Sequence, residues 1–153
     1  MKIELLKNYP EFIDELNELF YDEWHHFHAD RKKPQWKERL LTRVNGETIP
    51  TVLIALDNNT LLGSASLVVS DMDTRSDLSP WLAAVYVKDE CRGQGVGRKL
   101  VLAIENLAAK LNIETLYLYT PSKELFYKYQ GWETIEKTEY KNSDVVIMKK
   151  EIK

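Results

Sequence analysis

The sequence has little of what would place it in a specialised class of protein. It contains one cysteine, Cys91, so no internal disulfide can form, and a cytoplasmic location is expected. No apolar run approaches the length of a membrane span, and charges interrupt the N-terminal stretch too early for a signal peptide. The net charge of −3 argues against nucleic-acid binding. These absences predict a soluble protein that binds neither nucleic acid nor membrane.

The residues that are present predict one mixed α/β domain over residues 1–153. Hydrophobic residues make up 44% of the chain and charged residues 29%, as in ordinary globular proteins. No repeat, low-complexity tract or linker divides the chain. Strands are predicted at 2–7, 51–56, 61–70, 81–87, 115–120, 132–140 and 144–152, and helices at 10–24, 36–44, 95–111 and 123–129. The strand at 81–87 is almost entirely apolar, which places it in the middle of a sheet.

Three glycines at alternate positions mark the junction between the strand at 81–87 and the helix that follows. They are Gly93, Gly95 and Gly97, with Arg92 and Arg98 on either side. Glycine allows a ligand to approach the backbone closely, and free N–H groups at a helix N-terminus bind anions. The segment therefore predicts a phosphate-binding loop, the alternative being a turn that only joins a strand to a helix.

Two common phosphate-binding patterns fail here. A P-loop needs Gly-Lys-Ser/Thr, but Gly97 is followed by Arg98 and Lys99. A dinucleotide fingerprint needs a third glycine at position 98 or 100, which hold Arg98 and Leu100. A protein that uses the loop for ATP or a dinucleotide remains an alternative.

A third pattern fits, and a second segment agrees with it. Residues 92–97, RGQGVG, match the pattern R/Q-x-x-G-x-G/A, and residues 125–132, LFYKYQGW, are similar to an FYxKxGF segment. Together they make the chain resemble the GNAT family of N-acetyltransferases over most of its length, most weakly over residues 8–50. The resemblance implies an α/β fold with a mostly antiparallel central sheet, two splayed strands and flanking helices.

The resemblance also implies an activity, the transfer of acetyl from acetyl-CoA to a primary amine by direct attack in a ternary complex. The strand before the loop would hold the pantetheine arm as an added strand does, and an N–H near Val85 would polarise the acetyl carbonyl. Thr120 stands where many relatives have a cofactor-binding asparagine, and its hydroxyl could supply one hydrogen bond. The cosubstrate-binding residues implied are Val85, Tyr86, Val87, Arg92, Gly93, Gln94, Gly95, Val96, Gly97, Arg98 and Thr120.

Tyr127 matches the family's tyrosine that protonates the departing thiolate. A phenol, with a pKa of ~10, remains a proton donor over the working pH range. The alternative is that Tyr127 only packs in the core beside Phe126. Tyr129 lies two residues further on and points to a different face. Ser122 is expected to cap the helix at 123–129.

The general base and the acceptor are not fixed by the sequence. Some relatives carry a glutamate on the strand before the loop, but Trp81, Leu82 and Ala83 fill that place here. The remaining candidates are water, a carboxylate of the acidic loop or one at the end of the first helix, each of which could equally be a solvated side chain: Asp71, Asp73, Asp77 and Glu23. The acidic loop favours a cationic amine such as a polyamine or an amino sugar, and a protein amine remains open.

Other features receive simpler interpretations. The histidines at 25, 26 and 28 are expected to bind no metal, because no cysteine lies near and neighbouring helical residues diverge. Trp24, Trp36 and Trp81 could line an acceptor pocket or pack in the core. Cys91 is interpreted as incidental. The alternative to an enzyme is an acyl-CoA-binding sensor or interaction module without catalysis, and the protein is expected to be a monomer or a homodimer.

Overall fold

The computed structural model describes residues 1–152, which form one seven-stranded sheet in the order β1-β2-β3-β4-β5-β7-β6. All neighbouring strands are antiparallel except β4 and β5, which are parallel. The strands are β1 (Lys2–Leu5), β2 (Thr51–Asp57), β3 (Thr60–Val68), β4 (Trp81–Val87), β5 (Thr115–Thr120), β6 (Glu133–Tyr140) and β7 (Ser143–Glu151). The helices are α1 (Ile13–Trp24), α2 (Lys33–Leu41), α3 (Val96–Lys110) and α4 (Glu124–Lys128). The predicted mixed fold with a mostly antiparallel sheet is confirmed.

The main difference from the predicted elements lies at the start of α2. The sequence predicted that this helix begins at residue 36, but it begins at Lys33, with Pro34 in its first turn. Proline suits this position because its fixed φ is already helical and its missing N–H has no partner there. The backbone N–H of Lys32 donates to Oε1 of Gln35 at 2.6 Å and fixes the entry into the helix. The proline therefore marks the beginning of α2.

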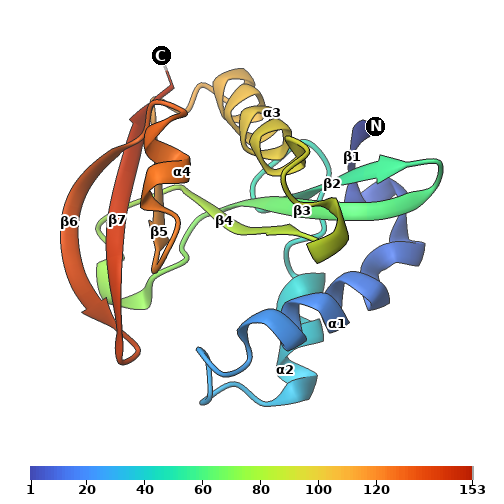
Figure 1. Ribbon diagram of the computed structural model, residues 1–153, viewed down its shortest axis with the longest axis horizontal. Coiled ribbons are helices and arrows are strands. Elements are labelled where there is room, and N and C mark those ends of the chain that lie inside the picture. Colours follow the sequence, from blue (N-terminus) through green and yellow to red (C-terminus); the bar gives the residue numbers. More distant parts are fainter. Residues whose placement is uncertain (153) are drawn as a thin grey trace.

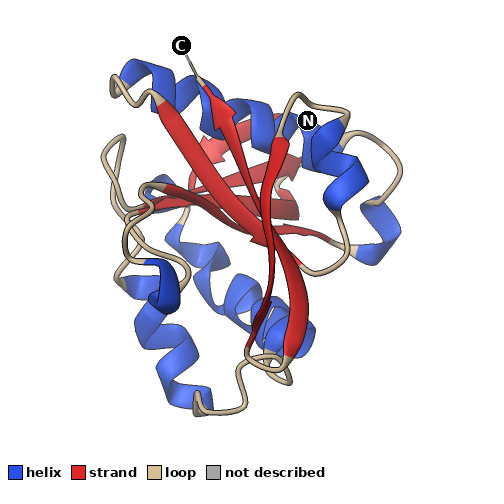
Figure 2. Ribbon diagram, turned by 90° about the vertical axis from the view of Figure 1, so that its left-hand side faces the viewer, coloured by secondary structure: helices blue, strands red, loops and turns tan. Residues whose placement is uncertain are grey.

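Helices cover both faces of the sheet, with α3 on one face and α1 and α2 on the other (Figures 1 and 2). Side chains of β2 alternate between the two layers, as the period of a strand requires. Leu53 and Ala55 pack in the cluster that contains α3, whereas Val52 and Ile54 pack in the cluster that contains α1 and α2. A sheet buried on both faces needs apolar residues at successive positions, which explains the continuous apolar runs of β2 and β4.

The sheet divides between β4 and β5. The two strands pair only at Trp81 and Tyr117, near the start of β4. Beyond this point β4 continues beside β3 while β5 follows β7 (Figure 1). Trp81 is fully buried at the junction, and its Nε1 donates to the carbonyl of Leu78 at 2.7 Å. The strands are therefore joined at one end and parted at the other.

Candidate functional site

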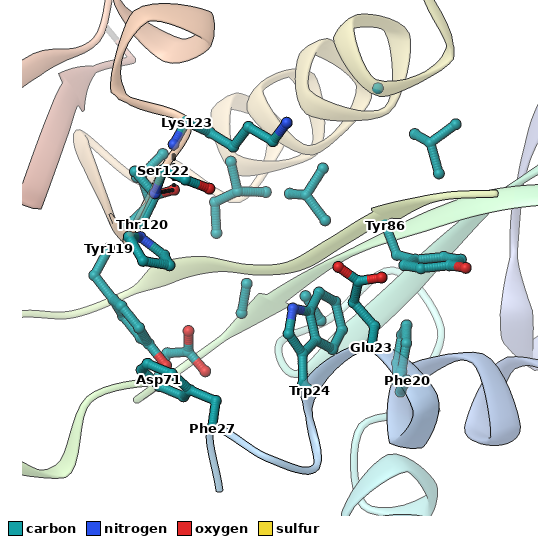
Figure 3. A pocket seen from close by; sticks show the side chains of 18 of the residues that line it. Phe20, Glu23, Trp24, Phe27, Asp71, Tyr86, Tyr119, Thr120, Ser122 and Lys123 are labelled. Carbon is teal, nitrogen blue, oxygen red and sulfur yellow. Dashed lines mark hydrogen bonds between the residues drawn. The ribbon is translucent and has the colours of Figure 1, made fainter. Parts of the chain in front are cut away.

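A cavity of about 790 Å³ lies where β4 and β5 part. One end is formed by the glycine loop, the start of α3 and α4, and the other by the end of α1 and by α2 (Figure 3). Gln94 does not line the cavity, and its side chain reaches the carbonyl of Glu90 at 3.4 Å. The other predicted site residues all line it: Val85, Tyr86, Val87, Arg92, Gly93, Gly95, Val96, Gly97, Arg98, Thr120 and Tyr127.

The strand that borders the cavity carries a β-bulge. Tyr86 pairs with Ser64 and Ala83 with Ser66, so Ala84 and Val85 together face the single residue between those two serines. Ala84 has a φ of 51°, a left-handed conformation that is uncommon for residues other than glycine. A bulge interrupts the ladder of hydrogen bonds and re-aims the strand. Backbone groups of β4 therefore leave the regular ladder at the middle of the cavity wall.

The glycine loop has the geometry of an anion site. Gly93 and Gly95 have φ values of 76° and 83°, and a Cβ at either position would meet nothing within 4 Å. These glycines are thus required by their backbone conformation, since the space beside them is open. Gly95 is the N-cap of α3 and offers no side chain to the free N–H groups of the first turn, which also contains no acidic residue. The N-terminus of α3 is therefore available to an anionic ligand.

The Arg92 side chain stabilises the glycine loop through contacts with neighbouring residues. Its Nε donates to the carbonyl of Val87 at 2.9 Å, and one of its terminal nitrogens lies 2.8 Å from Asp89. Its other terminal nitrogen lies 3.7 Å from Glu23. Basic charge at the loop is completed by Arg98 and by Lys123, whose side chain extends from the end of β5 toward α3 in Figure 3.

Tyr127 lies against the core but reaches the cavity. Its side chain is 7% exposed and packs against Phe126 and Trp132 with ring centroids 5.0 and 6.1 Å away. The hydroxyl forms no hydrogen bond with any other group of residues 1–152. Burial raises the pKa of this phenol above its usual value, so the hydroxyl is protonated at neutral pH.

Thr120, and not Ser122, stabilises the turn that leads into α4. Its Oγ1 accepts hydrogen bonds from the backbone N–H groups of Ser122 and Lys123 at 3.4 and 3.0 Å. The prediction for Ser122 is wrong because α4 begins at Glu124, with Lys123 as its N-cap and no side-chain bond at that cap. The Thr120 hydroxyl hydrogen is not used in these contacts and remains available to a ligand.

The family model of the GNAT acetyltransferases matches residues 9–132 of the sequence. The protein belongs to the GNAT acetyltransferase family. It is an acetyl-CoA-dependent N-acetyltransferase, and acetyl-CoA is its cosubstrate. The open loop at Gly93 and Gly95, with its free first-turn N–H groups, fits the pyrophosphate of this cosubstrate.

Solved structures of acetyltransferases share the fold of this GNAT protein. An aminoglycoside 6′-N-acetyltransferase in complex with coenzyme A has a TM-score of 0.79 and 19% identity, covering 99% of this chain and 97% of its own. A ribosomal-protein-alanine N-acetyltransferase from Brucella melitensis has a TM-score of 0.76 and 18% identity, covering 99% of both chains. A putative acetyltransferase from Salmonella typhimurium with acetyl-CoA has a TM-score of 0.74 and 17% identity, covering 99% of this chain and 94% of its own. No curated protein matches the sequence at a significant level.

The four candidate bases of this acetyltransferase lie in different surroundings. Glu23 and Asp71 line the cavity. Asp73 lies outside it and accepts a hydrogen bond from the Tyr140 hydroxyl at 3.1 Å. Asp77 also lies outside and is ion-paired with an arginine at 3.1 Å. The acidic loop thus contributes one carboxylate to the site.

Three arginines that were not predicted from the sequence line the end of the cavity formed by α1 and α2: Arg31, Arg39 and Arg43. Arg43 lies 3.7 Å from Asp71, and both side chains are largely buried. Burial lowers the pKa of Arg43 and raises that of Asp71, although the neighbouring opposite charge acts against each shift. The sequence signal was the four-residue spacing of Arg39, near the C-terminal end of α2, and Arg43, two residues past that end.

His28 also lines this end of the GNAT site, in its neutral form. Burial, followed by the charges of Arg31 and Lys141, lowers its pKa from 6.5 to about 3. Its Nδ1 lies 2.9 Å from Nζ of Lys141, which can only donate, so Nδ1 accepts and Nε2 carries the proton. Among residues 1–152, no three His, Cys, Asp or Glu side chains group closely enough to hold a metal ion.

The three tryptophans considered as pocket residues and Cys91 differ in whether they line the cavity. Trp24 and Trp36 line the cavity, whereas Trp81 belongs to the core. Cys91 is half-buried and lines the cavity near the glycine loop.

No helix in residues 1–152 is long and apolar enough to span a membrane.

Proposed function

We propose that this protein, as one domain over residues 1–153, acetylates a primary amine by direct attack within a ternary complex. One observation carries the proposal: the gap between β4 and β5, the anion-binding end of α3 and the Tyr127 hydroxyl border a single cavity. Two substrates that enter one cavity from opposite ends can react without an acyl-enzyme. Acetyl-CoA supplies an activated thioester, and the residues of this chain bind it, orient it and move the protons.

The cosubstrate would lie along β4. The unpaired side of residues 85–87 offers backbone groups to the pantetheine amides, as an edge strand does to an added strand. The N–H groups of residues 92–98 would hold the pyrophosphate, with Arg98 and Lys123 supplying positive charge. The Thr120 hydroxyl can donate one further hydrogen bond to the ligand.

The β4 bulge would supply the hydrogen-bond donor for the negative charge that develops on the acetyl oxygen. Ala84 and Val85 lie outside the regular ladder, and we place the N–H of Val85 against the acetyl carbonyl oxygen. A fixed backbone donor in a partly dry site stabilises negative charge more in the transition state than in the ground state.

Two side chains would move protons. Tyr127, protonated and free of other hydrogen bonds, donates to the departing thiolate. We assign the base to Glu23, directly or through water, because its carboxylate points toward the bulged part of β4 (Figure 3). Asp71 is less suited, since it lies against Arg43 at the far end of the cavity.

A panel of primary amines, followed by release of free thiol from acetyl-CoA, tests this function. Turnover of one chemical class of amine is expected, together with thermal stabilisation by acetyl-CoA and CoA. Stabilisation by ATP or NAD alone would identify a nucleotide-binding protein. Binding of acetyl-CoA without thiol release from any amine would identify the non-catalytic module instead.

A further inference from the structure

The acceptor end of the cavity carries positive charge that the protein does not neutralise. Three guanidinium groups, those of Arg31, Arg39 and Arg43, line it together with one nearby carboxylate, Asp71. The other carboxylate of the cavity, Glu23, lies 3.7 Å from a different cation of the glycine loop. This end is therefore cationic in a chain whose net charge is −3.

Arg31 is held in place by uncharged partners. Its guanidinium lies over the ring of Trp36, 4.7 Å from the centroid, and its terminal nitrogen is 3.5 Å from Nδ1 of His28. Within residues 1–152 it forms no ion pair with a carboxylate. A second cation, Lys141, lies 2.9 Å from the same imidazole nitrogen. The carboxylate that forms an ion pair with Lys141, that of Asp30, is exposed. The guanidinium is thus positioned and partly desolvated without an ion pair to a carboxylate.

Arg39 adds a second unpaired guanidinium from α2. It lies one helical turn before Arg43, and within the described part of the chain no carboxylate pairs with it. Burial lowers the pKa of Arg31 and of Arg43, which shows that both cations give up solvent at this site. An incoming anion would restore the electrostatic stabilisation that this burial removes.

We propose that the acceptor amine carries an anionic oxygen group, a carboxylate or a phosphate, which Arg31 and Arg39 bind while the amine points toward β4. This inference rests on the proposed function and names the substrate class of that site. Guanidinium groups bind planar oxyanions through paired hydrogen bonds, which also fixes the orientation of the ligand. A polyamine or an amino sugar would bring like charge to the arginines, so the expectation of a cationic acceptor is replaced.

Matched pairs of acceptors test the proposal. Phenylalanine with phenethylamine and arginine with agmatine differ by one carboxylate, and phosphoethanolamine with ethanolamine differs by one phosphate. With thiol release as the readout, we expect kcat/KM for the anionic member to exceed that of its partner by about tenfold or more in at least one arm. The arm that shows the preference identifies the anion. Equal or better use of the partner that lacks the anionic group in every arm would overturn the proposal.

Variants of the arginines locate the effect. R31Q and R39Q should raise the acceptor KM about tenfold with little change in kcat, and should erase the preference for the anionic member. The KM for acetyl-CoA should stay unchanged, and R39K should restore part of the preference. K37Q removes a positive charge from the exposed side of α2, where Lys37 pairs with Asp14, and should change nothing. A preference that survives in both R31Q and R39Q contradicts the assignment.

A binding experiment separates this inference from the proposed function. The CoA-saturated protein is titrated calorimetrically with N-acetylphenylalanine and N-acetylphenethylamine, and with N-acetylphosphoethanolamine and N-acetylethanolamine. Tighter binding of the anionic product in one pair, lost in R39Q, supports the anion site even where no amine is turned over. Equal binding within both pairs contradicts it even where the protein proves to be an acetyltransferase of uncharged amines.

Discussion

Substitution of Tyr127 by phenylalanine should separate catalysis from stability. The side chain is 7% exposed, and its hydroxyl has no hydrogen-bond partner within residues 1–152, so removal of the oxygen leaves no protein group unsatisfied. The melting temperature should therefore change by no more than about 2 °C. Loss of the proton donor to the thiolate should lower kcat by about 10²- to 10⁴-fold.

The assay is thiol release at saturating acetyl-CoA and amine, together with KM for acetyl-CoA and a thermal melt. Because burial raises the pKa of the phenol, the wild-type group stays protonated, and the ratio of the two kcat values should be constant across the working pH range. Tyr129→Phe is the matched control, since this tyrosine is 87% exposed, and it should leave every parameter unchanged. A kcat within about threefold of wild type would refute the proton-donor role. A large loss in Tyr119→Phe alone would move the role to that cavity phenol.

Three further predictions concern stability and cosubstrate binding. Gly63→Ala should lower stability by about 3 kcal/mol, seen in urea unfolding, because its Cβ would overlap the carbonyl of Tyr86, whereas the control Gly46→Ala has room and should cost less than about 1 kcal/mol. In Gly95→Ala, alanine disfavours the φ of 83° by about 1 kcal/mol, so the free loop should relax away from it. Restoring this conformation on binding should make CoA binding roughly fivefold weaker by calorimetry. The pKa of His28 falls from 6.5 unfolded to about 3 folded, so its stabilisation is complete above pH 6.5 and is lost as pH falls toward 3. Urea unfolding should show the free energy of unfolding falling as pH drops from 7 to 4, and this fall should be shallower in His28→Gln.

The elements of the fold could be predicted because local periodicity determined them. Strands β4 and β5 have the predicted bounds, and α3 lies within one residue of its predicted limits at each end. These segments are strongly patterned, β4 follows Pro80 and β5 precedes Pro121, and α3 lies between Gly95 and Asn112. The start of α2 was missed because proline serves equally in a loop and in a first helical turn.

The cosubstrate half of the cavity was predictable for the same reason, and the acceptor half was not. The glycine loop is contiguous, so its pattern is visible in a single segment. The acceptor end combines Arg31 and Arg39 with Asp71 and Tyr119, which come from separate parts of the chain and meet only in the fold. Each is an ordinary residue in its own segment, so no local pattern distinguishes it from a solvated side chain.

On the side of β4 away from the cavity, the strand is held closely to β3 at Gly63. Gly63 pairs with Val87 and lies between two irregularities of β3, one with β2 near Leu56 and one opposite the β4 bulge. The Tyr86 carbonyl approaches it so closely that no side chain fits. This close contact holds β4 to β3 beyond the bulge, over the same residues whose other edge is not paired with β5. A glycine outside the predicted loop therefore helps to hold the strand that borders the cavity.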